Sequence, residues 1–122
     1  MKLVVNLPLG AAIVALGEAL ALGESLALDR SLVLNVLADS PIGSTVKSKR
    51  ANIESGHYPP NFKLRHAAKD LRLVTETADA TGRDLRLAHA TLTWLDEATK
   101  HGAADLDYSA VVAAIVGEKA ST

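Results

Sequence analysis

Apolar residues recur along most of this chain at three- and four-residue steps, the spacing that places side chains on one face of an α-helix. The pattern is clearest over residues 63–81. Its recurring positions there are Leu64, Ala67, Ala68, Leu71, Val74, Thr75 and Ala78. No stretch of useful length alternates between apolar and polar residues as a strand does. The sequence therefore predicts an all-α fold, organised by helix packing rather than by a sheet.

Glycine, proline and potential capping residues divide this pattern into about six helices within a single domain, residues 1–122. The expected helices cover residues 2–23, 28–38, 44–54, 63–81, 84–101 and 109–119. The expected N-cap residues are Asp29, Asp84 and, for the last helix, Asp107 or Ser109. Gly23, Gly82 and Gly102 end three of these helices. We expect roughly the last three or four residues to fray.

The expected first helix is long and apolar, and residues 3–17 carry no charge. Pro8 lies inside it, where a proline can kink the helix. Gly10, Gly17 and Gly23 leave room for another backbone to approach closely. A helix that is apolar on nearly all sides is usually buried in a core or in a subunit interface. We therefore expect a homodimer that forms through this helix.

The same stretch invites comparison with a membrane span or a signal peptide. A span needs about 18 or more apolar residues. This run is shorter, is interrupted by Pro8 and Gly10, and is closed by Glu18. A signal peptide would end at a small-residue cleavage site followed by a mature domain, and no convincing site of this kind follows the apolar run. We expect no association with a membrane.

Composition narrows the classes of function further. With 48% hydrophobic and 22% charged residues among 122, the chain is expected to be globular rather than disordered. A net charge of -1 and the lack of a basic stripe argue against nucleic acid as a partner, and the run Lys47, Lys49, Arg50 is too small to change that. No cysteine occurs, which is consistent with a cytoplasmic location. The four histidines match no ligand spacing, so no metal site is expected.

Two short motifs carry the candidate chemistry. Lys2 and Asn6 are four residues apart in the expected first helix, so an ammonium and a carboxamide share one face. Further along, Phe62 precedes Lys69 and Asp70 by about two helical turns, at the start of the clearest helical pattern. Each motif alone is weak evidence of a site, and their combination is more specific.

Together with Gly102-Ala-Ala-Asp-Leu-Asp107-Tyr-Ser109, these motifs resemble the C-terminal domain of the β-hydroxyacid dehydrogenase family, over essentially the whole chain. That family includes the 3-hydroxyisobutyrate, tartronate semialdehyde and glyoxylate/succinic semialdehyde reductases and the related imine reductases. Its helical domain is similar to that of 6-phosphogluconate dehydrogenase. A lysine at position 2 favours an alcohol or aldehyde substrate over an imine.

The resemblance implies a role for each of five residues. Lys2 matches the catalytic lysine, which exchanges a proton with the substrate oxygen during hydride transfer. Asn6 matches the residue that orients this lysine and binds the substrate. Phe62 matches an aromatic wall of the nicotinamide pocket. Lys69 matches a cofactor contact, and Asp70 matches a neighbouring polar residue of the cofactor-binding site.

Members of this family also have an N-terminal Rossmann domain. No Gly-x-Gly-x-x-Gly motif follows a strand in this sequence, so the pyrophosphate site cannot be built from this chain. The resemblance implies NAD or NADP as the cofactor of the full-length protein. We expect a longer parent with a Rossmann domain, a small-molecule substrate, no cofactor stably bound by this chain alone, and no activity by it alone.

An alternative function remains open from the residues themselves. Without the resemblance, Lys2 is a solvated lysine near the chain start, Phe62 is a loop hydrophobe folded onto the core, and Lys69 and Asp70 are surface charges of an amphipathic helix. The chain would then be a stand-alone helical module that dimerises or binds a partner and performs no catalysis.

Overall fold

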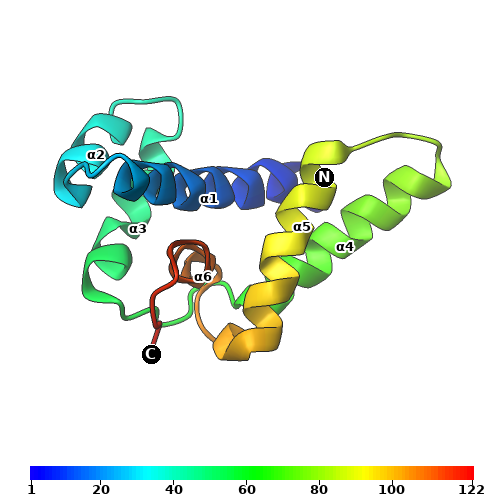
Figure 1. The fold of residues 1–122 in the computed structure, drawn as a ribbon. Helices are drawn as coiled ribbons and strands as arrows, with labels where there is room; N and C mark the ends of the chain where they lie inside the picture. Colours follow the sequence, from blue (N-terminus) through cyan, green and yellow to red (C-terminus); the bar gives the residue numbers. More distant parts are fainter.

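The computed structural model describes all of residues 1–122 and contains helices but no β-strand, which confirms the predicted all-α fold (Figure 1). The main helices are α1 (Lys2–Ser25), α2 (Arg30–Leu37), α3 (Gly43–Ser55), α4 (Leu64–Ala80), α5 (Arg86–Ala98) and α6 (Val111–Val116). A turn of π-helix, Thr99–Ala103, follows α5, and a short 3-10 helix, Tyr108–Ala110, leads into α6.

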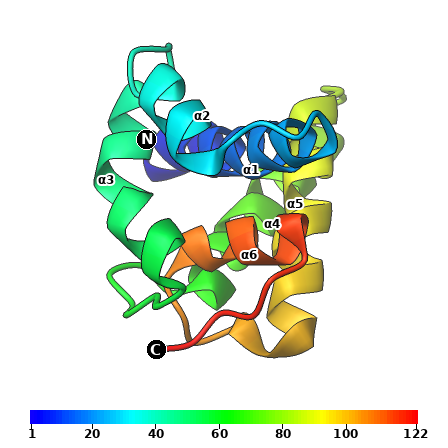
Figure 2. The ribbon, with the colours of Figure 1, turned by 60° about the vertical axis from the view of Figure 1, so that its left-hand side comes forward.

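Helix α1 is the axis around which the other helices are arranged. It runs across the molecule, with α2 and α3 around its C-terminal end and α4 and α5 packed near its N-terminal half (Figure 1). Figure 2 shows α6 beneath α1, between α3 and α5. These neighbours bury one side of the apolar helix within the chain.

The buried side of α1 forms the centre of the hydrophobic core. Ile13, Leu16 and Leu20 are at most 2% exposed. At the two ends of the helix, by contrast, Val4 is 69% exposed and Leu22 is 61% exposed. The middle of α1 therefore turns its large apolar side chains to the core, and the large apolar side chains that are exposed lie near the helix ends.

Glycines let the other helices approach α1, as predicted, but side chains rather than a neighbouring backbone fill the space. A Cβ atom added at Gly17 would lie 2.6 Å from Cδ1 of Ile115 on α6. At Gly10 it would lie 3.2 Å from Cδ2 of Leu71 on α4. These contacts make the glycines part of the packing between α1 and its neighbours.

Helix α1 passes through Pro8 without a break. By length and composition it also meets the requirement for crossing a membrane. The expectation that the apolar run is too short is therefore wrong, because the stretch continues past Glu18. The core helix of a soluble protein passes the same test, and 33% of the most apolar window of α1 is buried inside this fold.

Two of the predicted helix caps are found and one is not. The Asp29 carboxylate accepts a hydrogen bond from the Leu32 amide at 3.1 Å, and Asp107 caps the 3-10 helix by accepting from the Ser109 amide at 3.2 Å. The prediction for Asp84 is wrong: α5 begins at Arg86, and the Asp84 carboxylate instead pairs with the Arg86 guanidinium at 2.8 Å.

The C-terminal residues are held against the protein, so the prediction that they fray is also wrong. The Tyr58 amide donates to the Ser121 carbonyl at 2.7 Å, and the Ser121 amide donates to the Gly56 carbonyl at 3.0 Å. His57 Nδ1 lies 2.8 Å from the Ser121 hydroxyl. The tail thus joins the loop that follows α3.

A buried ion pair connects α3 to the segment before α6. Lys49 Nζ lies 2.9 Å from Asp107 Oδ2, and neither side chain is more than 7% exposed. Desolvation alone would raise the pKa of Asp107, but hydrogen bonds from Ser109, from Lys49 and from the amides of Phe62 and Asn61 outweigh it and lower the pKa. The carboxylate is therefore ionised inside the core and holds several chain segments together.

Substitution of Gly17 by valine should destabilise the protein by about 2 kcal/mol, because the new side chain overlaps Ile115 between α1 and α6. Urea unfolding of Gly17→Val, followed by Trp94 fluorescence, measures this change. Ala15→Val, at an exposed position of the same helix, is the matched control. Equal stability of the two variants would contradict the close packing of α6 on α1.

Protonation of Asp107 should destabilise the fold in acid. Its pKa is lowered on folding, so its stabilising contribution is complete above the unfolded value of about 4 and is lost as the pH falls through the folded value. Asp107→Asn should lower the free energy of unfolding by about 3 kcal/mol at pH 7, because Lys49 is left buried without a counter-charge. The same variant should show a weaker loss of stability below about pH 4 than the wild type does.

Denaturant unfolding at several pH values measures both effects. Asp105→Asn is the control, since the Asp105 side chain is 62% exposed in the same loop. If the wild type and Asp107→Asn lost stability in parallel as the pH falls, Asp107 would not be the ionised group that this account describes.

Candidate functional site

Lys2 and Asn6 meet a single carboxylate on α4. The Asn6 Nδ2 atom donates to Asp70 Oδ2 at 2.8 Å, and Lys2 Nζ lies 3.4 Å from Asp70 Oδ1. The two α1 residues are one turn apart, so both point to the same side, and each takes one oxygen of the carboxylate. Three of the five residues singled out from the sequence thus form one cluster where α1 and α4 pack together.

Asp70 is placed by the apolar periodicity of α4. It lies on the buried face of this helix, three residues after Ala67 and four before Val74, and is 4% exposed. A buried carboxylate requires partners, and Asn6 and Lys2 supply them from α1. Asp70, which the resemblance implies to be a polar residue of the cofactor-binding site, is thus directed at the two α1 side chains.

The cluster leaves two polar groups available to a ligand. The Lys2 side chain is 73% exposed, whereas that of Asp70 is 5% exposed, so a fixed anion holds an accessible ammonium. An ionised carboxylate can only accept hydrogen bonds, which requires the nitrogen of the Asn6 amide to face Asp70. The amide oxygen of Asn6 is then free to accept a hydrogen bond from a hydroxyl group.

Phe62 lies just before α4 and packs against the 3-10 helix. Its ring centroid is 5.7 Å from that of Tyr108, with the planes tilted by 53°. The Tyr108 amide donates to the Phe62 carbonyl at 2.7 Å. Burial raises the pKa of Tyr108 to about 12, with a smaller contribution from the charge of Asp107, so this phenol stays neutral at physiological pH. The remaining predicted residue, Lys69, is exposed on α4 beside Asp70 in the sequence.

The role of Lys49 was not predicted from the sequence, where this residue counted only as part of a short basic run. The structure buries Lys49 beside Asp107 and places its ammonium 5.0 Å from the centroid of the Tyr108 ring. The sequence does contain a signal for the burial of Lys49. The buried face of α3 includes Val46, Lys49 and Ile53, which recur at helical spacing. Asp107 was assigned only a capping role.

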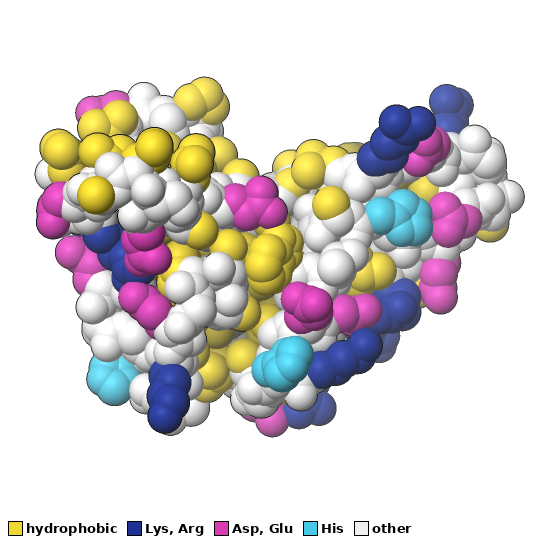
Figure 3. Space-filling model, viewed as in Figure 1, with side chains coloured by type: hydrophobic (Ala, Val, Ile, Leu, Met, Phe, Trp, Pro, Cys, Tyr) yellow, Lys and Arg dark blue, Asp and Glu magenta, His cyan; other side chains and the backbone are white.

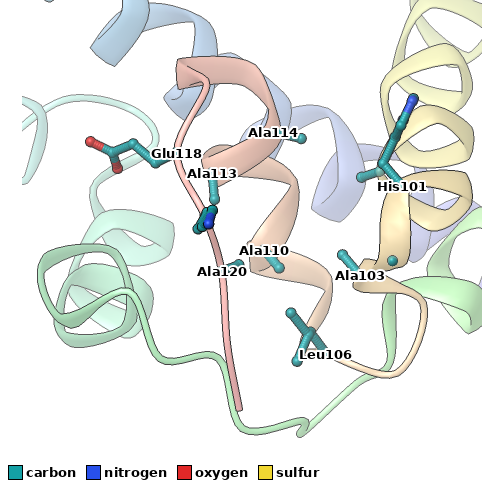
Figure 4. A pocket seen from close by; sticks show the side chains of 11 residues that line it. His101, Ala103, Leu106, Ala110, Ala113, Ala114, Glu118 and Ala120 are labelled. Atoms are coloured by element: carbon teal, nitrogen blue, oxygen red, sulfur yellow. The ribbon is translucent and has the colours of Figure 1, made fainter.

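The three main hollows of this chain are not lined by the predicted site residues. One cavity of about 300 Å³ lies between the end of α5, α6 and the C-terminal tail (Figure 4). Alanines make up most of its lining, and the Glu118 carboxylate at its edge forms an ion pair with the Arg30 guanidinium. A second hollow of about 260 Å³ adjoins the start of α1 and the end of α4, and its apolar lining includes Leu3, Leu7 and Val74.

Comparison with known proteins identifies relatives over nearly the whole chain. The sequence model of the family described as "NAD-binding of NADP-dependent 3-hydroxyisobutyrate dehydrogenase" matches residues 1–115. Glyoxylate/succinic semialdehyde reductase 1 of Arabidopsis thaliana is 32% identical over 116 residues, which cover 94% of this chain and 40% of the reductase. The human cytokine-like nuclear factor N-PAC is 29% identical over 117 residues, which cover 95% of this chain and 21% of that protein.

Solved structures agree with the sequence relatives. The crystal structure of 3-hydroxyisobutyrate dehydrogenase from Salmonella typhimurium superposes with a TM-score of 0.82 at 28% identity, over 91% of this chain and 39% of the dehydrogenase. This chain thus spans at most 40% of the length of these proteins. The family resemblance that the motifs predicted is confirmed: the chain belongs to the family of the NAD-binding domain of NADP-dependent 3-hydroxyisobutyrate dehydrogenase.

Proposed function

We propose that this chain is the helical domain of an NAD(P)-dependent oxidoreductase that acts on a small 3-hydroxy acid or semialdehyde, and that Lys2 is its catalytic acid. The observation that carries this proposal is the shared carboxylate of Asp70, which holds Lys2 and Asn6 side by side in a member of this family. The names of the Arabidopsis reductase and the Salmonella dehydrogenase support the substrate class.

Each residue of the cluster has a chemical task in this proposal. In the direction of reduction, the Lys2 ammonium donates a proton to the carbonyl oxygen of the substrate, and its positive charge stabilises the developing alkoxide. In the opposite direction the neutral amine accepts the proton of the substrate hydroxyl. Asn6 binds the substrate through its free amide oxygen, and Asp70 orients both α1 side chains without touching the substrate.

The residues of this chain fit the nicotinamide end of a dinucleotide and not its pyrophosphate. The bound cofactor would supply the hydride. Phe62 is partly buried and anchored by backbone hydrogen bonds, so it would form a wall against the nicotinamide. The exposed Lys69 would offer a positive charge to the rest of the cofactor. The chain has no glycine-rich loop between a strand and a helix, so a Rossmann domain must supply the pyrophosphate site. We therefore propose that this chain alone binds no cofactor stably and performs no turnover.

We further propose a homodimer, with a Rossmann domain in a longer parent, a cytoplasmic location, and neither nucleic acid nor a membrane as partner. The dimer surface is formed by the C-terminal end of α1 together with α2, where Figure 3 shows a row of apolar side chains. Its exposed members are Leu22, Leu26, Leu28, Leu32 and Val36, each between 49% and 64% exposed. Side chains of this kind favour contact with another apolar surface over water.

A second candidate function is a helical module that assembles with a partner and performs no catalysis. Two observations favour it: one relative is named as a nuclear factor rather than an enzyme, and the apolar surface of α2 does not belong to the Lys2 cluster. Under this reading Lys2 and Asn6 are present without a catalytic task.

Replacement of Lys2 distinguishes the two functions. In the longer protein that contains this chain, Lys2→Ala should lower kcat for NADPH-dependent reduction of succinic semialdehyde by roughly 100-fold or more, because the proton donor is lost. Absorbance at the NADPH band measures the rate. Lys47→Ala, which removes an exposed lysine of α3, should leave the rate unchanged. If the Lys2→Ala variant turned over substrate as fast as the wild type, the catalytic assignment would be contradicted.

Substitution of Leu32 by glutamate tests the dimer surface. A charge in the centre of an apolar interface should weaken association by roughly 100-fold, because the carboxylate cannot be desolvated without a partner. Sedimentation or light scattering at micromolar concentration measures the mass of the chain. Glu76→Gln on α4 is the control. A wild-type chain that remains monomeric under these conditions would rule out the proposed dimer.

A further inference from the structure

Residues 107 and 108 hold the backbone of Phe62 on both sides. The Phe62 amide donates to Asp107 Oδ1 at 3.1 Å, and the Phe62 carbonyl accepts from the Tyr108 amide at 2.7 Å. The Asn61 amide donates to the same oxygen of Asp107, also at 3.1 Å. Thus neither backbone polar group of Phe62 relies on a neighbour within its own loop.

The carboxylate that makes these bonds is itself fixed from several directions. Its second oxygen, Oδ2, accepts from Lys49 Nζ at 2.9 Å, from the Ser109 amide at 3.2 Å and from the Ser109 hydroxyl. Lys49 comes from α3, so its ammonium connects that helix to the loop through Asp107. With four partners on two oxygens besides the ion pair, the carboxylate has very little freedom to rotate.

We propose that Lys49 and Asp107 are a positioning pair that fixes the Phe62 ring for contact with the nicotinamide of the bound cofactor. The inference rests on the proposed dehydrogenase function, because it gives Phe62 the role of a pocket wall. Neither Lys49 nor Asp107 touches the cofactor. Their effect passes through the two backbone hydrogen bonds of Phe62 and through the tilted contact of its ring with Tyr108.

The arrangement goes beyond what stability requires. A buried ion pair is costly to desolvate, and apolar side chains of similar size often stabilise a core as well or better. What an ion pair adds is a defined geometry, because a charged carboxylate accepts only along its lone pairs. Here the Asp107 Oδ1 atom accepts only from the amides of Asn61 and Phe62, which lie three and two residues before the start of α4.

Fluorine NMR tests the positioning directly, because Phe62 is the only phenylalanine of the chain. With 4-fluorophenylalanine incorporated, the wild-type chain should give a single 19F resonance that reports on the Phe62 ring. Asp107→Asn and Lys49→Met should shift this resonance toward its position in the unfolded chain and broaden it. Ser109→Ala, which removes one donor and no charge, should cause a smaller shift in the same direction.

Two controls separate positioning from unfolding. Asp39→Asn removes an exposed carboxylate from the turn between α2 and α3 and should leave the resonance in place. The fluorescence of Trp94, the only tryptophan, shows which variants remain folded, and Ser109→Ala carries the test if the charge variants unfold. An unchanged 19F resonance in every variant that remains folded, including Ser109→Ala, would overturn the proposal.

Kinetics of the longer protein provide the functional part of the test. Asp107→Asn should raise the KM for NADPH roughly tenfold or more while kcat changes less, whereas loss of Lys2 acts on kcat. A fall in kcat without a change in KM would overturn the positioning role. A wild-type protein with no turnover at all would count against the proposed function, and the 19F resonance would still decide whether Lys49 and Asp107 hold Phe62.

Discussion

The need to bury one long apolar helix within 122 residues determines the arrangement of the other helices. Helix α1 packs against α2, α4, α5 and α6, and its core residues Ile13 and Leu16 are completely buried. Close packing at Gly17 fixes the distance to α6, because the Ile115 side chain of α6 occupies the space beside this glycine. At the start of α1 the cover is incomplete, so Lys2 is anchored on Asp70 and yet reaches solvent.

Two buried carboxylates connect this packing to the proposed chemistry. Asp70 binds the side chains of Lys2 and Asn6, and Asp107 binds the backbone of Phe62 and the ammonium of Lys49. Both anions lie in the interior, where an unpaired charge is expensive, so each requires its donors to stay in place. The two carboxylates therefore hold the residues of the proposed site, and the helices that bury these carboxylates also form the hydrophobic core.

Local patterns predicted the helices and three of the residues that come together, whereas other features depended on tertiary contacts. The apolar periodicity of α4 and the spacing of Lys2 and Asn6 are properties of single helices, so they could be recognised in the sequence. That Asp70 would lie between Lys2 and Asn6 depends on how α1 crosses α4. The burial of Lys49 was not predicted, because a lysine on an apolar face is buried only when the fold brings a distant acid beside it, here Asp107.

The central claim is that this chain acts as one domain of a larger nicotinamide-dependent enzyme. The most direct measurement is the mass of the native cellular protein detected with an antibody against this domain. The account predicts a single species of more than twice the 12.8 kDa of this chain, which retains NADPH-dependent reductase activity when purified. A native species of 12.8 kDa that copurifies with no nucleotide-binding chain would contradict it.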